Sequence, residues 1–155
     1  MTDLTFSDSL FIDIDPDALY ALVSDVTNMG QWSPQCKACW WEDSGGGPVV
    51  GAWFKGRNET PERTWETRSQ VVVADPGREF AWEVNGGWVR WGFTIESFDG
   101  GSRLTQSWVF LPAGIDGFGD RFGKGAEEQI VIRTQAAKHG IPVTLAAIKR
   151  TAEAG

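Results

Sequence analysis

The chain has 155 residues and a net charge of −7, with 14 Lys and Arg against 21 Asp and Glu. This length fits one domain, residues 1–155, which can bury a core without disulfides or metals. Nucleic acids and anionic membranes select basic surfaces, so we expect neither as a partner. No run approaches the roughly 18 apolar residues of a membrane span. Residues 1–6 lack a basic region followed by an apolar one, so we expect a cytoplasmic protein.

The first 34 residues predict a strand followed by two short helices. Residues 4–13 alternate loosely between polar and apolar side chains, as a strand does. Asp15-Pro16-Asp17 supplies an N-cap, a proline in the first turn and an early acid, which predicts a helix start. A second helical turn, capped by Thr27 or Asn28, should end near Pro34 because the residue before a proline resists the α conformation.

The middle of the chain predicts six more strands, separated by turn sequences. The turns are Ser44-Gly45-Gly46-Gly47-Pro48, Asp75-Pro76-Gly77, Asn85-Gly86-Gly87 and Asp99-Gly100-Gly101. The strands are expected near residues 36–43, 51–59, 65–74, 79–84, 88–98 and 102–111. Short hairpin connections make the resulting seven-stranded sheet antiparallel.

The last third predicts a loop and then a long helix. Residues 114–125 contain five glycines, and we expect a flexible loop that gates the entrance of any cavity. The spacing of these glycines does not match a dinucleotide-binding loop. The helix of about 30 residues should reach Ala152, either as one helix kinked near Gly140 and Pro142 or as two collinear helices. Its apolar stripe comprises Ala126, Ile130, Thr134, Ala137, Ile141, Leu145, Ile148 and Ala152.

Strand alternation sorts the sheet residues into an aromatic inner face and a charged outer face. The outer face carries opposite charges on neighbouring strands, which is typical of a solvated surface. Its members are Lys55, Arg57, Glu66, Arg68, Glu83, Arg90 and Glu96. The facing of Trp40, Trp41 and Trp53 stays open. The inner face comprises Phe54, Asn58, Trp65, Thr67, Ser69, Val71, Phe80, Trp82, Val84, Val89, Trp91, Phe93, Ile95, Leu104, Gln106, Trp108 and Phe110.

The inner face fits two interpretations, a dry aromatic core or a ligand cavity. The helix stripe offers small side chains against large rings, which leaves space, although rings can also interdigitate. The polar residues Asn58, Thr67, Ser69 and Gln106 favour the cavity, because buried polar groups need partners.

Little in the sequence points to acid–base or metal chemistry. The inner face holds no Asp, Glu, His, Lys or Cys, and the sole histidine, His139, falls on the solvent side of the helix. Cys36 and Cys39 form a C-x-x-C without enough further ligands for zinc, so we interpret them as reduced thiols in a strand and expect no metal and no cofactor. Tyr20 is expected to pack. Arg133, at the stripe's edge, either extends into solvent or reaches inward to hold an acidic or carbonyl group.

Five segments resemble the polyketide cyclase/dehydrase-like branch of the START, or SRPBCC, superfamily over nearly the whole chain. The resemblance implies an α+β helix-grip fold, a curved sheet around a long C-terminal helix with two short helices after the first strand. It also implies a deep pocket for a lipid, a polyketide or another apolar molecule. The segments are Asp15-Pro16, residues 25–34 (DVTNMGQWSP), residues 47–54 (GPVVGAWF), residues 74–82 (ADPGREFAW) and residues 100–105 (GGSRLT).

Three functions follow as hypotheses. The first is binding of a small hydrophobic, aromatic or polycyclic molecule, with rings as walls and polar groups that orient one or two oxygens. The second is an aromatase/cyclase-type enzyme with unassigned catalytic residues, in which the same cavity folds a polyketone. The third is an interaction module with a filled core, with Ile132 and Val143 on a partner or homodimer face. The expected ligand-binding residues are Phe54, Asn58, Trp65, Thr67, Trp82, Trp91, Phe93, Gln106, Trp108, Phe110 and Arg133.

Overall fold

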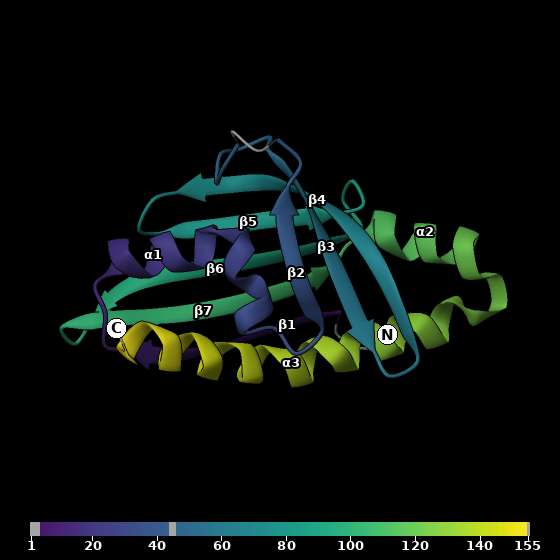
Figure 1. The fold of residues 1–155 in the computed structure, drawn as a ribbon. Helices are drawn as coiled ribbons and strands as arrows, with labels where there is room; N and C mark the ends of the chain where they lie inside the picture. The colour runs from purple at the N-terminus through teal and green to yellow at the C-terminus, as the bar shows by residue number, and fades with distance from the viewer. Residues whose placement is uncertain (1–3, 44–45, 155) are drawn as a thin grey trace.

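The fold is a curved antiparallel sheet with a long helix across its concave side (Figure 1). The computed structural model describes residues 4–43 and 46–154, so residues 1–3 and part of the predicted turn at residues 44–48 lie outside the described residues. The elements are β1 (Thr5–Ile12), α1 (Pro16–Ser24), η1 (Val26–Gln31), β2 (Cys36–Trp41), β3 (Trp53–Thr60), β4 (Arg63–Asp75), β5 (Glu79–Val84), β6 (Val89–Phe98), β7 (Gly101–Phe110), α2 (Pro112–Phe122), η2 (Gly123–Gly125) and α3 (Ala126–Ala154).

The sheet has seven strands in the order β1-β7-β6-β5-β4-β3-β2, and every neighbouring pair is antiparallel. From β2 to β7, each strand pairs with the strand that follows it in the sequence. Strand β1 lies at the edge of the sheet, beside β7. The helix-grip arrangement predicted from the resemblance is therefore confirmed. Figure 1 shows α1 near one end of the sheet and α2 near the other, with α3 running between them.

Two of the predicted hairpin turns have positive backbone φ angles, which Asn, Asp and Gly adopt more readily than other residues. Asn85 has φ 53° and Gly86 has φ 75°, while Asp99 has φ 50° and Gly100 has φ 81°. Positive φ at two successive residues matches the right-handed twist of the flanking strands, and these residue types adopt it at low cost. The turns fix the registers of β5 with β6 and of β6 with β7.

The first helix begins where the sequence predicts. The side chain of Asp15 accepts a hydrogen bond from the backbone N–H of Ala18, and Pro16 occupies the first turn. The cap of η1 was predicted wrongly, because Asp25 accepts hydrogen bonds from the N–H and Oγ1 of Thr27 and so occupies the N-cap itself. The carboxylate two residues before Thr27 accepts from a backbone N–H of the first turn, which is the role expected of Thr27 or Asn28.

The C-terminal helix is continuous. Helix α3 runs through Pro142 without interruption, so the alternative of two collinear helices is wrong. Pro142 is exposed, so the carbonyl that loses its N–H donor there can be hydrated. The predicted stripe faces the sheet, and Ala137, Ile141, Leu145 and Ile148 are buried. Among the described residues, no helix is long and apolar enough to cross a membrane.

The predicted loop at residues 114–125 is wrong, because residues 112–122 form helix α2. Two of its glycines allow close packing. A Cβ on Gly114 would overlap the carbonyl oxygen of Trp88, and a Cβ on Gly117 would overlap the Trp88 ring. Tertiary contact therefore overrides the weak helix propensity of glycine.

Candidate ligand cavity

A cavity of about 220 Å³ lies between the concave face of the sheet and α3. Ten of the eleven residues predicted to bind ligand border it. The interior is therefore not filled, contrary to the premise of the interaction-module hypothesis. The ten residues are Phe54, Asn58, Trp65, Thr67, Trp82, Trp91, Phe93, Gln106, Trp108 and Arg133.

Packed rings from neighbouring strands form the inner wall. The centroid of Trp82 lies 5.9 Å from that of Phe54 and 5.9 Å from that of Phe93, with the ring planes inclined to one another. These three residues and Trp108 are buried. Their mutual contacts make this wall rigid and apolar, as in sites for aromatic ligands.

Gln106 supplies a polar group within this apolar wall. Its side chain is 5% exposed, and its Oε1 atom accepts no hydrogen bond in the part of the chain that the structure describes. A buried acceptor without a partner costs free energy, which is recovered if the amide turns toward a ligand hydroxyl or N–H in the cavity. Gln106 is therefore the clearest polar anchor in the cavity.

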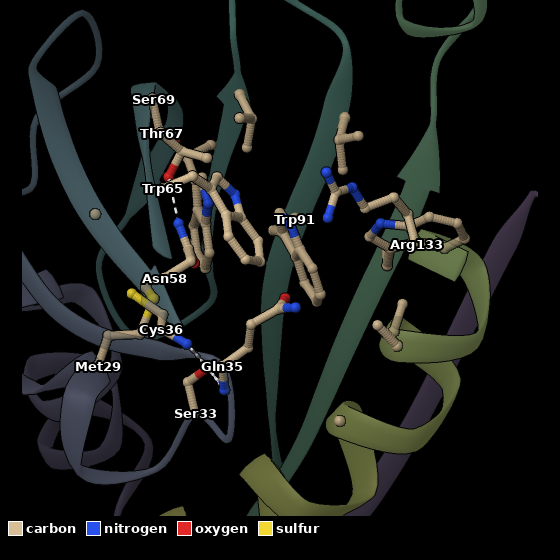
Figure 2. Close-up of a pocket in the computed structure, with 18 of the residues that line it drawn as sticks. Met29, Ser33, Gln35, Cys36, Asn58, Trp65, Thr67, Ser69, Trp91 and Arg133 are labelled. Carbon is tan, nitrogen blue, oxygen red and sulfur yellow. Dashed lines mark hydrogen bonds between the residues drawn. The ribbon is translucent and has the colours of Figure 1, made fainter. Parts of the chain in front are cut away.

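A second polar group lies on β3 and β4. The amide of Asn58 donates a hydrogen bond to Oγ1 of Thr67, 3.2 Å away, across the strand pair (Figure 2). Both side chains are half-buried, and Ser69 lies one inward position further along β4. The bond fixes the Asn58 side chain, whose carbonyl oxygen is left to accept from a ligand.

Phe110 is the predicted residue that the structure does not bring into the cavity lining. Its ring packs edge-on against Trp108 at 6.1 Å and against Phe118 at 5.0 Å. Phe118, on α2, borders the cavity instead. Phe122 of the same helix also borders the cavity, and neither ring is predicted to do so, because the glycine content of residues 114–125 predicts a loop.

Three arginines from different elements also border the cavity, and we call them the arginine cluster: Arg63 on β4, Arg121 on α2 and Arg133 on α3. Arg63 and Arg121 are exposed, so they mark the open end of the cavity. The Cζ of Arg63 and of Arg133 lie 4.5 and 5.0 Å from the ring centroid of Trp65. Burial, and then the charges of Arg63 and Arg121, hold the pKa of Arg133 below its usual value.

Cys36 and Cys39 also border the cavity, which corrects the expectation that no titratable thiol faces inward. Residues three apart in a regular strand face opposite ways, but a bulge between Cys36 and Ala38 restores both sulfurs to one side. Their Sγ atoms lie 3.2 Å apart. A Cβ on Gly56, on the facing strand, would lie 3.3 to 3.4 Å from both sulfurs, so glycine leaves room for them.

The two thiols differ in acidity. The hydrogen bond between them lowers the pKa of Cys36 and raises that of Cys39, and burial further raises the pKa of Cys39. Cys39 also contacts Met29, with its Sγ 3.8 Å from the Met29 Sδ. No signal in the strand pattern locates this sulfur group, because the bulge that creates it breaks the alternation.

The outer face is a solvated surface, as predicted. Arg57 pairs with Glu59, Arg68 with Glu42, and Arg90 with Glu83. The open question about three tryptophans is also settled. Trp53 faces outward beneath the guanidinium of Arg68, Trp41 packs against Phe54, and Trp40 is 39% exposed.

The other titratable candidates lie away from the cavity. His139 is exposed on α3. Tyr20 is buried edge-on against Phe80, and burial raises its pKa, which fits the predicted packing role. Within residues 4–43 and 46–154, no cluster of His, Cys, Asp and Glu could hold a metal ion.

Comparison with known proteins agrees with this architecture. Residues 3–137 match the family described as polyketide cyclase / dehydrase and lipid transport. No curated protein matches the chain. The solution structure of the Polyketide_cyc-like protein Cgl2372 from Corynebacterium glutamicum is 53% identical, over 98% of this chain and 93% of that one, with a TM-score of 0.71.

More distant structures share the fold alone. The di-domain ARO/CYC StfQ from the steffimycin biosynthetic pathway is 17% identical, with a TM-score of 0.69 over 97% of this chain and 51% of that one. Ara h 8.0201 is 15% identical, with a TM-score of 0.61 over 97% of this chain and 98% of that one. From the match over residues 3–137 and the 53% identical relative, we conclude that this chain belongs to the polyketide cyclase / dehydrase and lipid transport family.

Proposed function

We propose that the protein binds a compact aromatic or polycyclic molecule in the cavity between the sheet and α3. The observation that carries the proposal is the unpartnered Oε1 of Gln106 within an aromatic wall. Apolar walls with a few fixed polar groups are typical of small-molecule sites. The volume of about 220 Å³ lies below the roughly 300–1,000 Å³ of sites for drug-sized ligands, which favours a ligand of few rings.

In this proposal the predicted site residues have distinct roles. Trp65, Trp82, Trp91, Phe93 and Trp108 bury the rings of the ligand, while Asn58 and Gln106 bind its oxygen or N–H groups. The proposal places the protein in the cytoplasm, which agrees with the two free thiols of the chain. Nucleic acid is not a partner in this proposal, because the net charge is −7. The homodimer face at Ile132 and Val143, both exposed, stays a prediction.

The test is calorimetric titration with 2-naphthalenemethanol, a neutral two-ring probe with one hydroxyl. We expect saturable binding to the wild type and at least a roughly tenfold weaker affinity for Ala136→Phe, whose ring would occupy the cavity. Gln135→Phe is the matched control, since Gln135 is exposed on the same helix turn. Equal binding by both variants, or none by the wild type, would contradict the proposal. Native mass spectrometry of gently purified protein checks for a retained ligand.

A second candidate is a polyketide cyclase-type enzyme acting in the same cavity. The observation that favours it is the Cys36 thiol, whose pKa is lowered by its hydrogen bond with Cys39 and which borders the cavity. The family description includes cyclases and dehydrases as well as lipid transport. Loss of turnover of a poly-β-ketone substrate at unchanged affinity in Asn58→Ala or Arg133→Ala would favour the enzyme, whereas equal loss of both would favour binding alone.

A further inference from the structure

The arginine cluster differs from three arginines on the outer face of the sheet. Arg57, Arg68 and Arg90 on the outer face each pair with a carboxylate. In residues 4–43 and 46–154, no ion pair and no hydrogen bond uses a guanidinium of the arginine cluster, although acidic residues exceed basic ones by 21 to 14 in the whole chain. Although the protein is acidic, the cations that border its cavity therefore have no carboxylate partner among the described residues.

Ring contacts involve the flat faces of these guanidiniums and not their N–H donors. Arg63 and Arg133 both lie over the ring of Trp65, and Arg133 also lies 5.8 Å from the centroid of Phe118. A ring interacts with the flat face of a guanidinium, whereas its N–H donors point outward in the guanidinium plane. These donors therefore remain available to a planar acceptor such as a carboxylate.

The cluster carries an electrostatic cost in the absence of an anion. Burial first, and then the charges of Arg63 and Arg121, lower the pKa of Arg133, which means that both neighbouring cations repel it. Glu66 also borders the cavity, but it alternates with Trp65 and Thr67 along β4 and so points to the opposite face. No carboxylate of the described residues forms an ion pair with these three guanidiniums.

The cluster lies at one end of the aromatic cavity. Arg63 and Arg121 are exposed, Arg133 is half-buried, and Gln106 and Trp108 are buried. Figure 2 shows the guanidinium of Arg133 extending from α3 toward Trp91, between the helix and the strands. The site is therefore amphipathic, cationic at its open end and apolar at its inner end.

We infer that the ligand is an aromatic or polycyclic carboxylate, with its rings in the cavity and its carboxylate bound by the arginine cluster at the open end. This inference rests on the proposed function and adds the charge and the orientation of the ligand. Charge-assisted hydrogen bonds from a guanidinium to a carboxylate are stronger than neutral ones and fix the direction in which the ligand enters.

The experiment compares three naphthalene probes that share one ring system: 2-naphthoate, neutral 2-naphthalenemethanol and cationic 2-naphthylmethylammonium. In calorimetric titrations of the wild type we expect 2-naphthoate to bind roughly tenfold more tightly than the alcohol and the ammonium to bind weakest. The affinity for 2-naphthoate should fall as salt is raised, since salt screens the exposed arginines. If the negative charge of the whole protein dominated instead, salt would strengthen 2-naphthoate binding.

Variants test whether the arginine cluster causes the preference for 2-naphthoate over the alcohol. Arg133→Gln keeps N–H donors but loses the charge, so we expect it to lower the affinity for 2-naphthoate roughly tenfold and for the alcohol less than twofold. Arg63→Gln, at an exposed site, repeats the test where folding is not at risk. Arg150→Gln is the matched control, because Arg150 is exposed on α3 and does not border the cavity.

Each outcome separates this inference from the proposed function. Equal affinities for the three probes, or equal losses for 2-naphthoate and the alcohol in Arg133→Gln and Arg63→Gln, would overturn the carboxylate inference and leave the cavity as a neutral binding site. Tightest binding of the ammonium would also overturn it. No binding by any probe would overturn the proposed function and the inference with it.

Discussion

Lys149 and Glu153 attach the C-terminal end of α3 to the first strand. The ammonium of Lys149 donates hydrogen bonds to the carbonyl oxygen of Phe11, at 2.8 Å, and to the carboxylate of Glu153, at 2.6 Å. The same carboxylate accepts from the backbone N–H of Asp13 at 2.9 Å. The Lys149 bond first, and then the Asp13 bond, hold the pKa of Glu153 below its usual value.

A carboxyl group with a lowered pKa stabilises the fold above its ordinary pKa, and that contribution is lost as the pH falls through the pKa of the folded state. We therefore expect Glu153→Gln to lower the melting temperature at pH 7 and the difference from wild type to shrink below about pH 4. Thermal melts at both pH values measure this. Glu62→Gln, at an exposed turn residue, is the control. An equal difference at both pH values would contradict the expectation.

At the scale of elements, α2 depends on its glycines to lie against the start of β6. Gly114 is buried, and an added Cβ would overlap the backbone carbonyl of Trp88, which cannot rotate away. Gly119 lies in the same helix but is exposed and has open space around it. Alanine at Gly114 changes both the packing and the helix propensity, whereas alanine at Gly119 changes the helix propensity alone.

We expect Gly114→Ala to destabilise the protein by about 1–3 kcal/mol through overpacking. Gly119→Ala should stabilise it by about 0.5–1 kcal/mol, because alanine restricts the unfolded chain and favours the helix. Urea denaturation of both variants beside the wild type gives the two free energies of unfolding. A loss of stability in Gly119→Ala similar to that in Gly114→Ala would mean that α2 does not pack as described.

For the whole molecule, α3 acts as the second wall of the core along the length of the sheet. Leu145 and Ile148 are 0% exposed and belong to the same buried cluster as Leu104 and Ile12, on strands β7 and β1. Sheet and helix therefore bury one another, and neither has another apolar partner of comparable extent in the described chain. We expect them to unfold together.

Leu145→Ala should cost about 2–5 kcal/mol, since it removes a fully buried side chain and leaves a cavity. The helix signal in circular dichroism and the tryptophan fluorescence of the sheet should still change at one denaturant concentration. Val143→Ala, at a position that is 41% exposed, should change stability by less than about 0.5 kcal/mol. Separate transitions for the two signals would contradict a shared core.

Much of the fold follows from local patterns. Alternation along β4 places Trp65 and Thr67 on the inner face because side chains in a strand repeat every two residues, whatever the strand packs against. Asp99 and Gly100 set a hairpin because few residue types adopt positive φ at low cost. Asp15 caps α1 through a contact three residues away. The sequence by itself therefore determined the strands, most of their inner face, the hairpin turns at residues 85–86 and 99–100, and the start of α1.

Other features depend on contacts between residues far apart in the chain. The helical state of residues 112–122 depends on space beside Trp88, and the inward facing of Cys39 depends on a bulge against β3. Phe110 packs edge-on against Phe118 of α2, and Phe118 borders the cavity in its place. The arginine cluster exists only where β4, α2 and α3 meet. Tertiary structure alone decided these features, because periodicity reports which way a side chain points and not what lies opposite.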